Sequence, residues 1–238
     1  MSDLPENREI ELAIRKLKNE ILRMASLTRQ NLQKAVQALL ERDIDLARQV
    51  IADDSEVDEL EITVDRIGME ILTNYHPNPT DLRKVIATMK ISTCLERVSD
   101  HAVNIAKRAR KIFKGPSIAD VTVIETLYNM ADNLLRDSMI SFADGNAAIG
   151  EGLKARDKEL DTLHKKIIAD FSARLEASNG QAESLLHIIF IIRSIERVGD
   201  LAVNIGEDAV FMCSAMDIRH SRNGNQHSIV DFQGRAVG

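Results

Sequence analysis

The chain has 238 residues, of which 44% are hydrophobic and 29% charged, with a formal net charge of −6. This length is enough to bury a sizeable core, and an acidic chain without a basic stripe does not suit a nucleic-acid-binding protein. Aromatic residues are only 3% of the chain and Trp is absent, so the sequence predicts an aliphatic core.

No stretch predicts a membrane-spanning or secretory segment. The longest strongly apolar run, residues 185–192, is too short to cross a bilayer, and the N-terminus lacks the apolar region of a signal peptide. Cys94 and Cys213 lie far apart in apolar surroundings, typical of small buried hydrophobic residues in a reducing compartment. We therefore expect a soluble, cytoplasmic protein.

Apolar residues recur at three- and four-residue spacing along almost the whole chain, which predicts helices throughout. Clusters of Pro, Gly, Asn and Asp divide this pattern into segments. The predicted helices span residues 8–40, 44–75, 80–113, 118–143, 147–177 and 181–215.

Capping residues mark several of the predicted helix starts. Asp43 and Asp45 suit the turn and N-cap before the second helix. Thr80 follows two prolines and is expected to cap the third helix. Ser117 and Asp120 have the spacing of a capping box before the fourth helix.

An internal repeat fixes the predicted organisation of the chain. The segment Glu96–Ala106 recurs one hundred residues later as Glu196–Gly206, with eight of eleven positions identical. Short turns make successive helices antiparallel neighbours. We therefore predict an all-α fold of six helices in two tandem pseudo-symmetric antiparallel three-helix bundles, at 1–115 and 116–216, followed by a polar tail at 217–238.

Carboxylates recur at equivalent places in the two units. Each repeat carries Glu, Asp and Asn at i, i+4 and i+8, which places them in one row on a helix face. Each preceding helix carries an i, i+4 pair of aspartates. If neighbouring helices face these residues toward one another, four carboxylates meet in each unit and need cations nearby. The eight residues are Asp54, Asp58, Glu96, Asp100, Asp157, Asp161, Glu196 and Asp200.

Two interpretations of these clusters stay open on spacing alone. Arg97 and Arg197 could neutralise the acids as ion pairs, or the carboxylates could bind hard or borderline metal ions such as magnesium, manganese, calcium or iron. Zinc is less expected without His or Cys in the cluster, although His164, three residues after Asp161, could join it. The sequence has no Glu-x-x-His, phosphate-binding loop or nucleophile elbow, so we expect no enzymatic activity.

One basic run also has two interpretations. It consists of Lys107, Arg108, Arg110, Lys111 and Lys114. Cations at a helix C-terminus offset the helix macrodipole. The same run could instead be a docking patch for a membrane surface or an acidic partner.

The duplicated Glu-Arg-Val-x-Asp-x-Ala-x-Asn-Ile motif resembles the PhoU family, as do the Asp43–Asp54 stretch and the Asn78–Arg83 turn. The resemblance covers about residues 8–215, and Gly199 stands where the first copy has Ser99. It implies a non-catalytic, cytoplasmic negative regulator of phosphate uptake and the phosphate-starvation response.

The resemblance also implies partners and ligands. The partners would be the ATPase subunit of a phosphate ABC transporter, a sensor histidine kinase and a second copy in a homodimer, with membrane contact made through these partners. The eight carboxylates would bind clusters of iron, manganese, magnesium or zinc ions. The alternative is a metal-free helical scaffold or adaptor; a carboxylate-metal hydrolase is disfavoured because no His or Lys recurs beside the acids.

Overall fold

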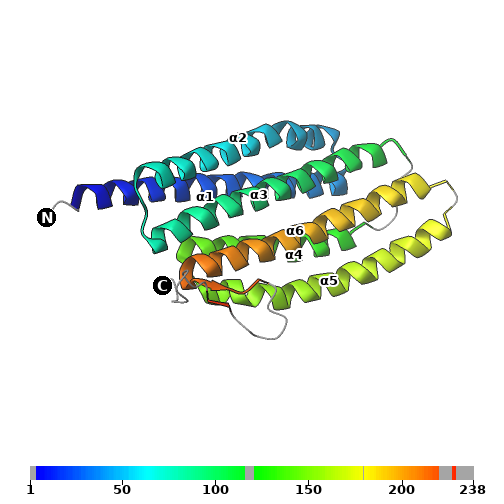
Figure 1. The fold of residues 1–238 in the computed structure, drawn as a ribbon. Coiled ribbons are helices and arrows are strands. Elements are labelled where there is room, and N and C mark those ends of the chain that lie inside the picture. Colours follow the sequence, from blue (N-terminus) through cyan, green and yellow to red (C-terminus); the bar gives the residue numbers. More distant parts are fainter. Residues whose placement is uncertain (1–3, 116–120, 179, 220–226, 229–238) are drawn as a thin grey trace.

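The computed structural model describes residues 4–115, 121–178, 180–219 and 227–228 (Figure 1). The all-α fold is confirmed. The helices are α1 (Leu4–Glu41), α2 (Ile44–Asn74), α3 (Pro79–Ile112), α4 (Val123–Asp144), α5 (Ala147–Glu176) and α6 (Ala182–Ser214).

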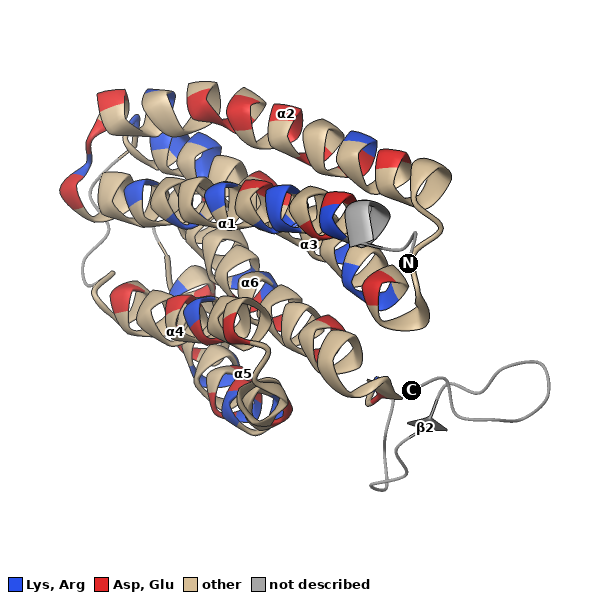
Figure 2. Ribbon diagram, turned by 90° about the vertical axis from the view of Figure 1, so that its left-hand side faces the viewer, with Lys and Arg blue, Asp and Glu red and all other residues tan. Residues whose placement is uncertain are grey.

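The helices pack as two groups of three that meet along their long axes. α1, α2 and α3 contact one another, as do α4, α5 and α6, and α3 packs along α6 while α1 touches α4. Figures 1 and 2 show α1 and α4 on one side of the molecule, α3 and α6 on the other, and α2 and α5 at opposite outer edges. The buried aliphatic core is continuous across both groups. α3 and α6 lie side by side and form the floor of a broad face, which α2 and α5 flank.

The first two interhelical turns show how local residues set the helix starts. Asp43 caps α2, as predicted, by accepting hydrogen bonds from the backbone N–H groups of Asp45 and Leu46. The prediction that Thr80 caps α3 is wrong. Asn78 is the cap, and Pro79 takes the first helical position, where its fixed φ suits the helix and a missing N–H costs nothing.

The start of α4 differs from the prediction. The helix begins at Val123 instead of residue 118, and Thr122 precedes it without a side-chain capping bond. The predicted capping pair Ser117 and Asp120 lies outside the described residues. α4 ends at Gly145, whose positive φ of 65° closes the turn into α5.

The end of α6 holds two features that the sequence did not indicate. Strand β1 (Met216–Asp217) pairs antiparallel with β2 (His227–Ser228), so part of the predicted tail is ordered. The expectation that both cysteines are buried is wrong for Cys213, which is exposed near the end of α6, while Cys94 is half-buried. Among the described residues, no helix combines the length and apolar character needed to traverse a bilayer.

α5 and α6 approach each other closely through two glycines. A Cβ atom at Gly150 would lie 2.7 Å from the backbone oxygen of Gly206 and 2.7 Å from a methyl group of Val210. Only residues without a side chain fit this helix crossing. The crossing aligns α5 with the half of α6 that carries the second copy of the repeat.

Candidate metal centre and the cleft between the units

The first carboxylate cluster lies between α2 and α3. Burial raises the pKa of Asp58, and the charges of Asp54 and Asp100 raise it further. The pKa of Glu96 is raised by burial and then by Asp100, while Arg97 partly opposes the shift. Mutual repulsion of this kind requires proximity, so the structure brings the four predicted residues of this unit together.

Ser99 organises the first cluster. Its hydroxyl donates a hydrogen bond of 2.8 Å to Oδ1 of Asp54, which joins α3 to α2. The bond holds one carboxylate in place and satisfies a lone pair that would otherwise face a partly buried surface.

The second cluster lies between α5 and α6. Burial, followed by the charges of Asp200, Asp161 and Glu196, raises the pKa of Asp157 to about 6. Glu196 is affected in the same direction, first by burial and then by Asp200. The four predicted residues of the second unit are therefore also brought together, and Asp157 is the most strongly perturbed.

The two clusters differ at the repeat position occupied by Ser99 and Gly199. Oδ1 of Asp157 is shielded from solvent and has no hydrogen-bond partner in the described structure. It points at Gly199, where an added Cβ would lie 3.1 Å away. Because glycine has no hydroxyl, Asp157 lacks the bond that Asp54 receives.

Arginine neutralises part of the second cluster. Nη1 of Arg197 lies 2.8 Å from Oδ2 of Asp200, and its Nε lies 3.5 Å from Oε2 of Glu196. The Arg197 side chain is 53% exposed, so these ion pairs contribute little to stability. The ion-pair interpretation therefore holds for Asp200 and Glu196 and leaves Asp157 unneutralised.

Two further side chains belong to the clusters. Glu61 raises the pKa of Glu96, and the charge of His164 lowers that of Glu196. Nε2 of His164 is shielded from solvent without a hydrogen-bond partner among the described residues. Glu61 stands three positions after Asp58, and His164 stands three positions after Asp161. A search of the third position after these aspartates in both units would therefore have found Glu61 as well as His164.

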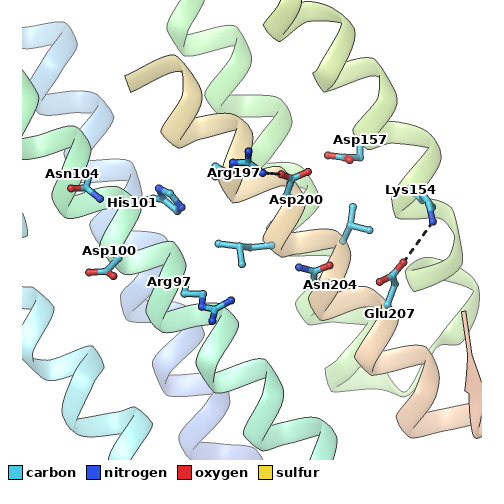
Figure 3. A pocket seen from close by; sticks show the side chains of 12 residues that line it. Arg97, Asp100, His101, Asn104, Lys154, Asp157, Arg197, Asp200, Asn204 and Glu207 are labelled. Atoms are coloured by element: carbon cyan, nitrogen blue, oxygen red, sulfur yellow. Dashed lines mark hydrogen bonds and ion pairs between the residues drawn. The ribbon is translucent and has the colours of Figure 1, made fainter. Parts of the chain in front are cut away.

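A cleft of about 780 Å³ separates the two clusters along the floor of the broad face. In Figure 3, Asp157 and Asp200 face each other across α5 and α6, whereas Asp100 is turned to the opposite side of α3. His101 points from α3 toward α6. Residues from both copies of the repeat line this cleft: Arg97, Asp100, His101 and Asn104 on α3, Lys154 and Asp157 on α5, and Arg197, Asp200, Leu201, Val203, Asn204 and Glu207 on α6.

The fit of these residues to a metal ion can be judged from their arrangement. In the described part of the chain, no three Asp, Glu, His or Cys side chains are already arranged to hold an ion. The donor chemistry nevertheless suits hard or borderline cations, since each cluster combines carboxylates that repel one another. Oδ1 of Asp157 is a carboxylate oxygen that has no hydrogen-bond partner among the described residues. The clusters fit a metal by composition and charge, and binding would require side-chain rotation.

Fold and site together define a class: tandem three-helix bundles that carry a carboxylate cluster in each unit. The PhoU domain model matches the chain over residues 21–109 and 124–209. The chain belongs to the PhoU family. A Zymomonas mobilis protein named phosphate-specific transport system accessory protein PhoU homolog is 32% identical over 204 residues, which cover 86% of each chain. The phosphate-specific transport system accessory protein PhoU of Edwardsiella tarda is 31% identical, over 90% of this chain and 86% of its own.

Solved structures give the same result. The crystal structure of PhoU from Pseudomonas aeruginosa matches with a TM-score of 0.82 and 26% identity, over 85% of this chain and 97% of that one. The phosphate transport system regulatory protein PhoU from Streptococcus pneumoniae has a TM-score of 0.81 at 22% identity, over 88% of this chain and 99% of that one, and shows the same fold.

Proposed function

We propose that this protein regulates phosphate uptake and represses the phosphate-starvation response by changing its binding partners. Its partners would be the ATPase subunit of a phosphate ABC transporter and a sensor histidine kinase, both reached from the cytoplasm, and it would act as a homodimer. Membership of the PhoU family supports the phosphate system, and the relatives named above are accessory proteins of phosphate transport.

We also propose that the two carboxylate clusters bind metal ions, with iron, manganese, magnesium and zinc as candidates. The residues that would hold them are Asp54, Asp58, Glu96, Asp100, Asp157, Asp161, Glu196 and Asp200. A bound cation would neutralise carboxylates from two helices at once. The observation that carries this proposal is Asp157, whose shielded oxygen has no hydrogen-bond partner among the described residues and whose pKa is raised to about 6 by burial and then by three neighbouring acids.

Metal analysis of protein purified without chelators tests the metal proposal. We expect retained metal ions in the wild type and loss of most of them in the Asp100→Ala/Asp200→Ala variant. Glu59→Ala/Glu159→Ala is the matched control, because both residues are exposed acids on α2 and α5 outside the clusters. Undiminished metal in the first variant would refute the assignment.

Deletion of the gene tests the regulatory proposal. If the protein represses the starvation response through its partners, phosphate-starvation genes should stay active in phosphate-rich medium. Reporter expression in the deletion strain measures this directly, with the complemented strain as control. Normal repression in the deletion strain would contradict the regulatory function, whatever the metal content of the protein.

A metal-free adaptor is the second candidate function. The ion pairs of Arg197 with Asp200 and Glu196 favour it, because they neutralise part of one cluster without an ion. Such an adaptor should repress starvation genes equally well when Asp100 and Asp200 are both replaced by Ala. Full complementation by that variant, together with the absence of retained metal in the wild type, would decide for this candidate.

A further inference from the structure

A patch of cations and exposed apolar side chains lies where the end of α3 runs beside the start of α6. We define this basic–apolar patch by Lys107, Arg108 and Lys111 of α3 and Leu186, Phe190 and Arg193 of α6. The two helices are antiparallel neighbours, which brings these segments side by side (Figure 1). The Arg108 guanidinium stacks over the Phe190 ring at 4.0 Å, which ties the two halves of the patch together.

The apolar members of the patch are open to solvent. Leu186 and Phe190 are each 43% exposed and stand one helical turn apart on the same face of α6. Cations adjoin this apolar pair, because Arg193 follows one turn further along α6 and Arg108 stacks on the ring. Glu183, 91% exposed, lies 3.9 Å from His187, which follows Leu186 on α6.

Macrodipole compensation accounts for only part of this arrangement. Arg110 and Lys111 lie in the last turn of α3 and offset its dipole. Lys107 and Arg108 lie before that turn, and Arg193 belongs to a different helix. Helix capping therefore does not account for Lys107, Arg108 and Arg193, which adjoin the exposed side chains of Leu186 and Phe190.

We propose that the basic–apolar patch docks this protein directly on an anionic phospholipid surface. Lys and Arg near such a surface are attracted to its headgroups, and partly exposed Leu and Phe side chains insert at the boundary between headgroups and acyl chains. None of the six patch residues lines the cleft between the units, so the proposed contact uses side chains other than those of the cleft.

Charge distribution orients the molecule on that surface. Acidic residues are spaced along α2 (Figure 2), and both carboxylate clusters repel an anionic bilayer. The basic–apolar patch, at the end of α3 and the start of α6, attracts the anionic bilayer. The inference does not depend on metal binding or on the proposed partners, and it adds a direct lipid contact to a protein proposed to reach the membrane through other proteins.

Vesicle co-sedimentation of the full chain tests the proposal. In chelator and about 0.1 M salt, we expect binding to phosphatidylcholine vesicles containing phosphatidylglycerol, and little binding to phosphatidylcholine alone. Lys107→Glu/Lys111→Glu should lower the partition coefficient by about 25-fold or more, at about fivefold for each lost cation. Phe190→Ser should lower it by about fivefold to tenfold through lost apolar contact.

Matched variants on α1 separate the patch from a general effect of charge or polarity. Arg15→Glu/Lys16→Glu makes the same change in net charge, and Leu12→Ser removes another exposed apolar side chain. Both should bind vesicles like the wild type, with unchanged far-UV circular dichroism in every variant. Equal binding to neutral and anionic vesicles, or equal loss in patch and control variants, would overturn the proposal. If the protein does not bind vesicles but binds an acidic protein through the patch, the lipid proposal is wrong and the patch docks a protein partner.

Discussion

Asp54 and Asp157 occupy the same position in the two repeats and differ by one hydrogen bond. Asp54 accepts from Ser99, whereas Asp157 faces Gly199 with a shielded, unpartnered oxygen. Burial and three neighbouring acids raise the pKa of Asp157 to about 6, so the folded protein holds this proton more tightly than the unfolded chain does.

The pH dependence of stability follows from this pKa. A raised folded-state pKa stabilises the fold fully below the unfolded value of 3.8, and that contribution is lost as the pH rises through about 6. In chelator, the wild type should therefore lose more stability than Asp157→Asn between pH 4 and pH 7. Denaturant unfolding at both pH values measures this, and Glu159→Gln, an exposed acid on the same helix, is the control. An identical pH dependence for the wild type and Asp157→Asn would contradict the prediction.

Restoring the missing hydroxyl gives a second test at this position. Gly199→Ser should lower the pKa of Asp157, because the new hydroxyl can donate to its carboxylate as Ser99 does to Asp54. The added Cβ meets Asp157 at 3.1 Å and Leu160 at 3.2 Å, so both must yield slightly. Gly199→Ala supplies the Cβ without the hydroxyl and serves as control. NMR titration of the side-chain carboxyl should separate the two variants, and equal pKa values in them would refute the role of the hydroxyl.

At the scale of the elements, the α5–α6 crossing makes a sharp prediction about two glycines of one helix. Gly150→Ala should destabilise the protein by about 1–3 kcal/mol, because the new methyl group meets the backbone of Gly206 at 2.7 Å. Gly152→Ala should stabilise it by about 0.5–1 kcal/mol, because nothing lies within 4 Å and alanine favours the helix. Chemical denaturation measures both. Equal effects at the two sites would show that the crossing is not tightly packed.

The helices themselves could be predicted because their signals are local. All six predicted helix ends and four of the six predicted starts lie within one residue of the observed boundaries. Asp43, the two prolines and Gly145 act on adjacent backbone, so their effect can be seen in the sequence. The start of α4 was missed because Thr122 makes no side-chain cap, so no residue marks that position. Local chemistry likewise could not distinguish Asn78 from Thr80, since both are good N-cap residues and Pro79 decides between them.

The eight site residues could be found from repetition, whereas their surroundings could not. A carboxylate that recurs at the same place in two units is visible in the sequence. Whether its oxygen meets a hydroxyl, as in Asp54, or none, as in Asp157, depends on how two helices face each other. Glu61 escaped notice because its counterpart in the second unit is His164, so the position does not repeat in residue type.

At the scale of the whole molecule, an ion pair between α3 and α6 joins the two units. Nζ of Lys90 lies 3.1 Å from Oδ1 of Asp208, whose side chain is only 9% exposed. Lys90→Met should destabilise the protein by about 1.5–3 kcal/mol, because the carboxylate loses a charged hydrogen bond in a buried place. Lys90→Met/Asp208→Leu should recover part of this loss. Chemical denaturation of both variants provides the measurement, and a double variant as unstable as the first single one would contradict the coupling.

The pseudo-symmetry of the two units stays a prediction. Residues 21–109 should superpose on residues 124–209, since a unit repeated in sequence buries its apolar face in the same way. An experimental structure in which the helices of the two segments cross at different angles would contradict it.

The cleft between the units has a consequence for how its two walls can differ. Two separate, identical three-helix chains assembled about a two-fold axis would be obliged to present the same residue on both walls. Because the two units here belong to one chain, equivalent positions in them can carry different residues. His101 occupies one wall and Leu201 the other, although eight of the eleven surrounding motif positions are the same. Duplication followed by single substitutions thus gives the cleft two walls of different chemistry, one of which carries an imidazole where the other is apolar.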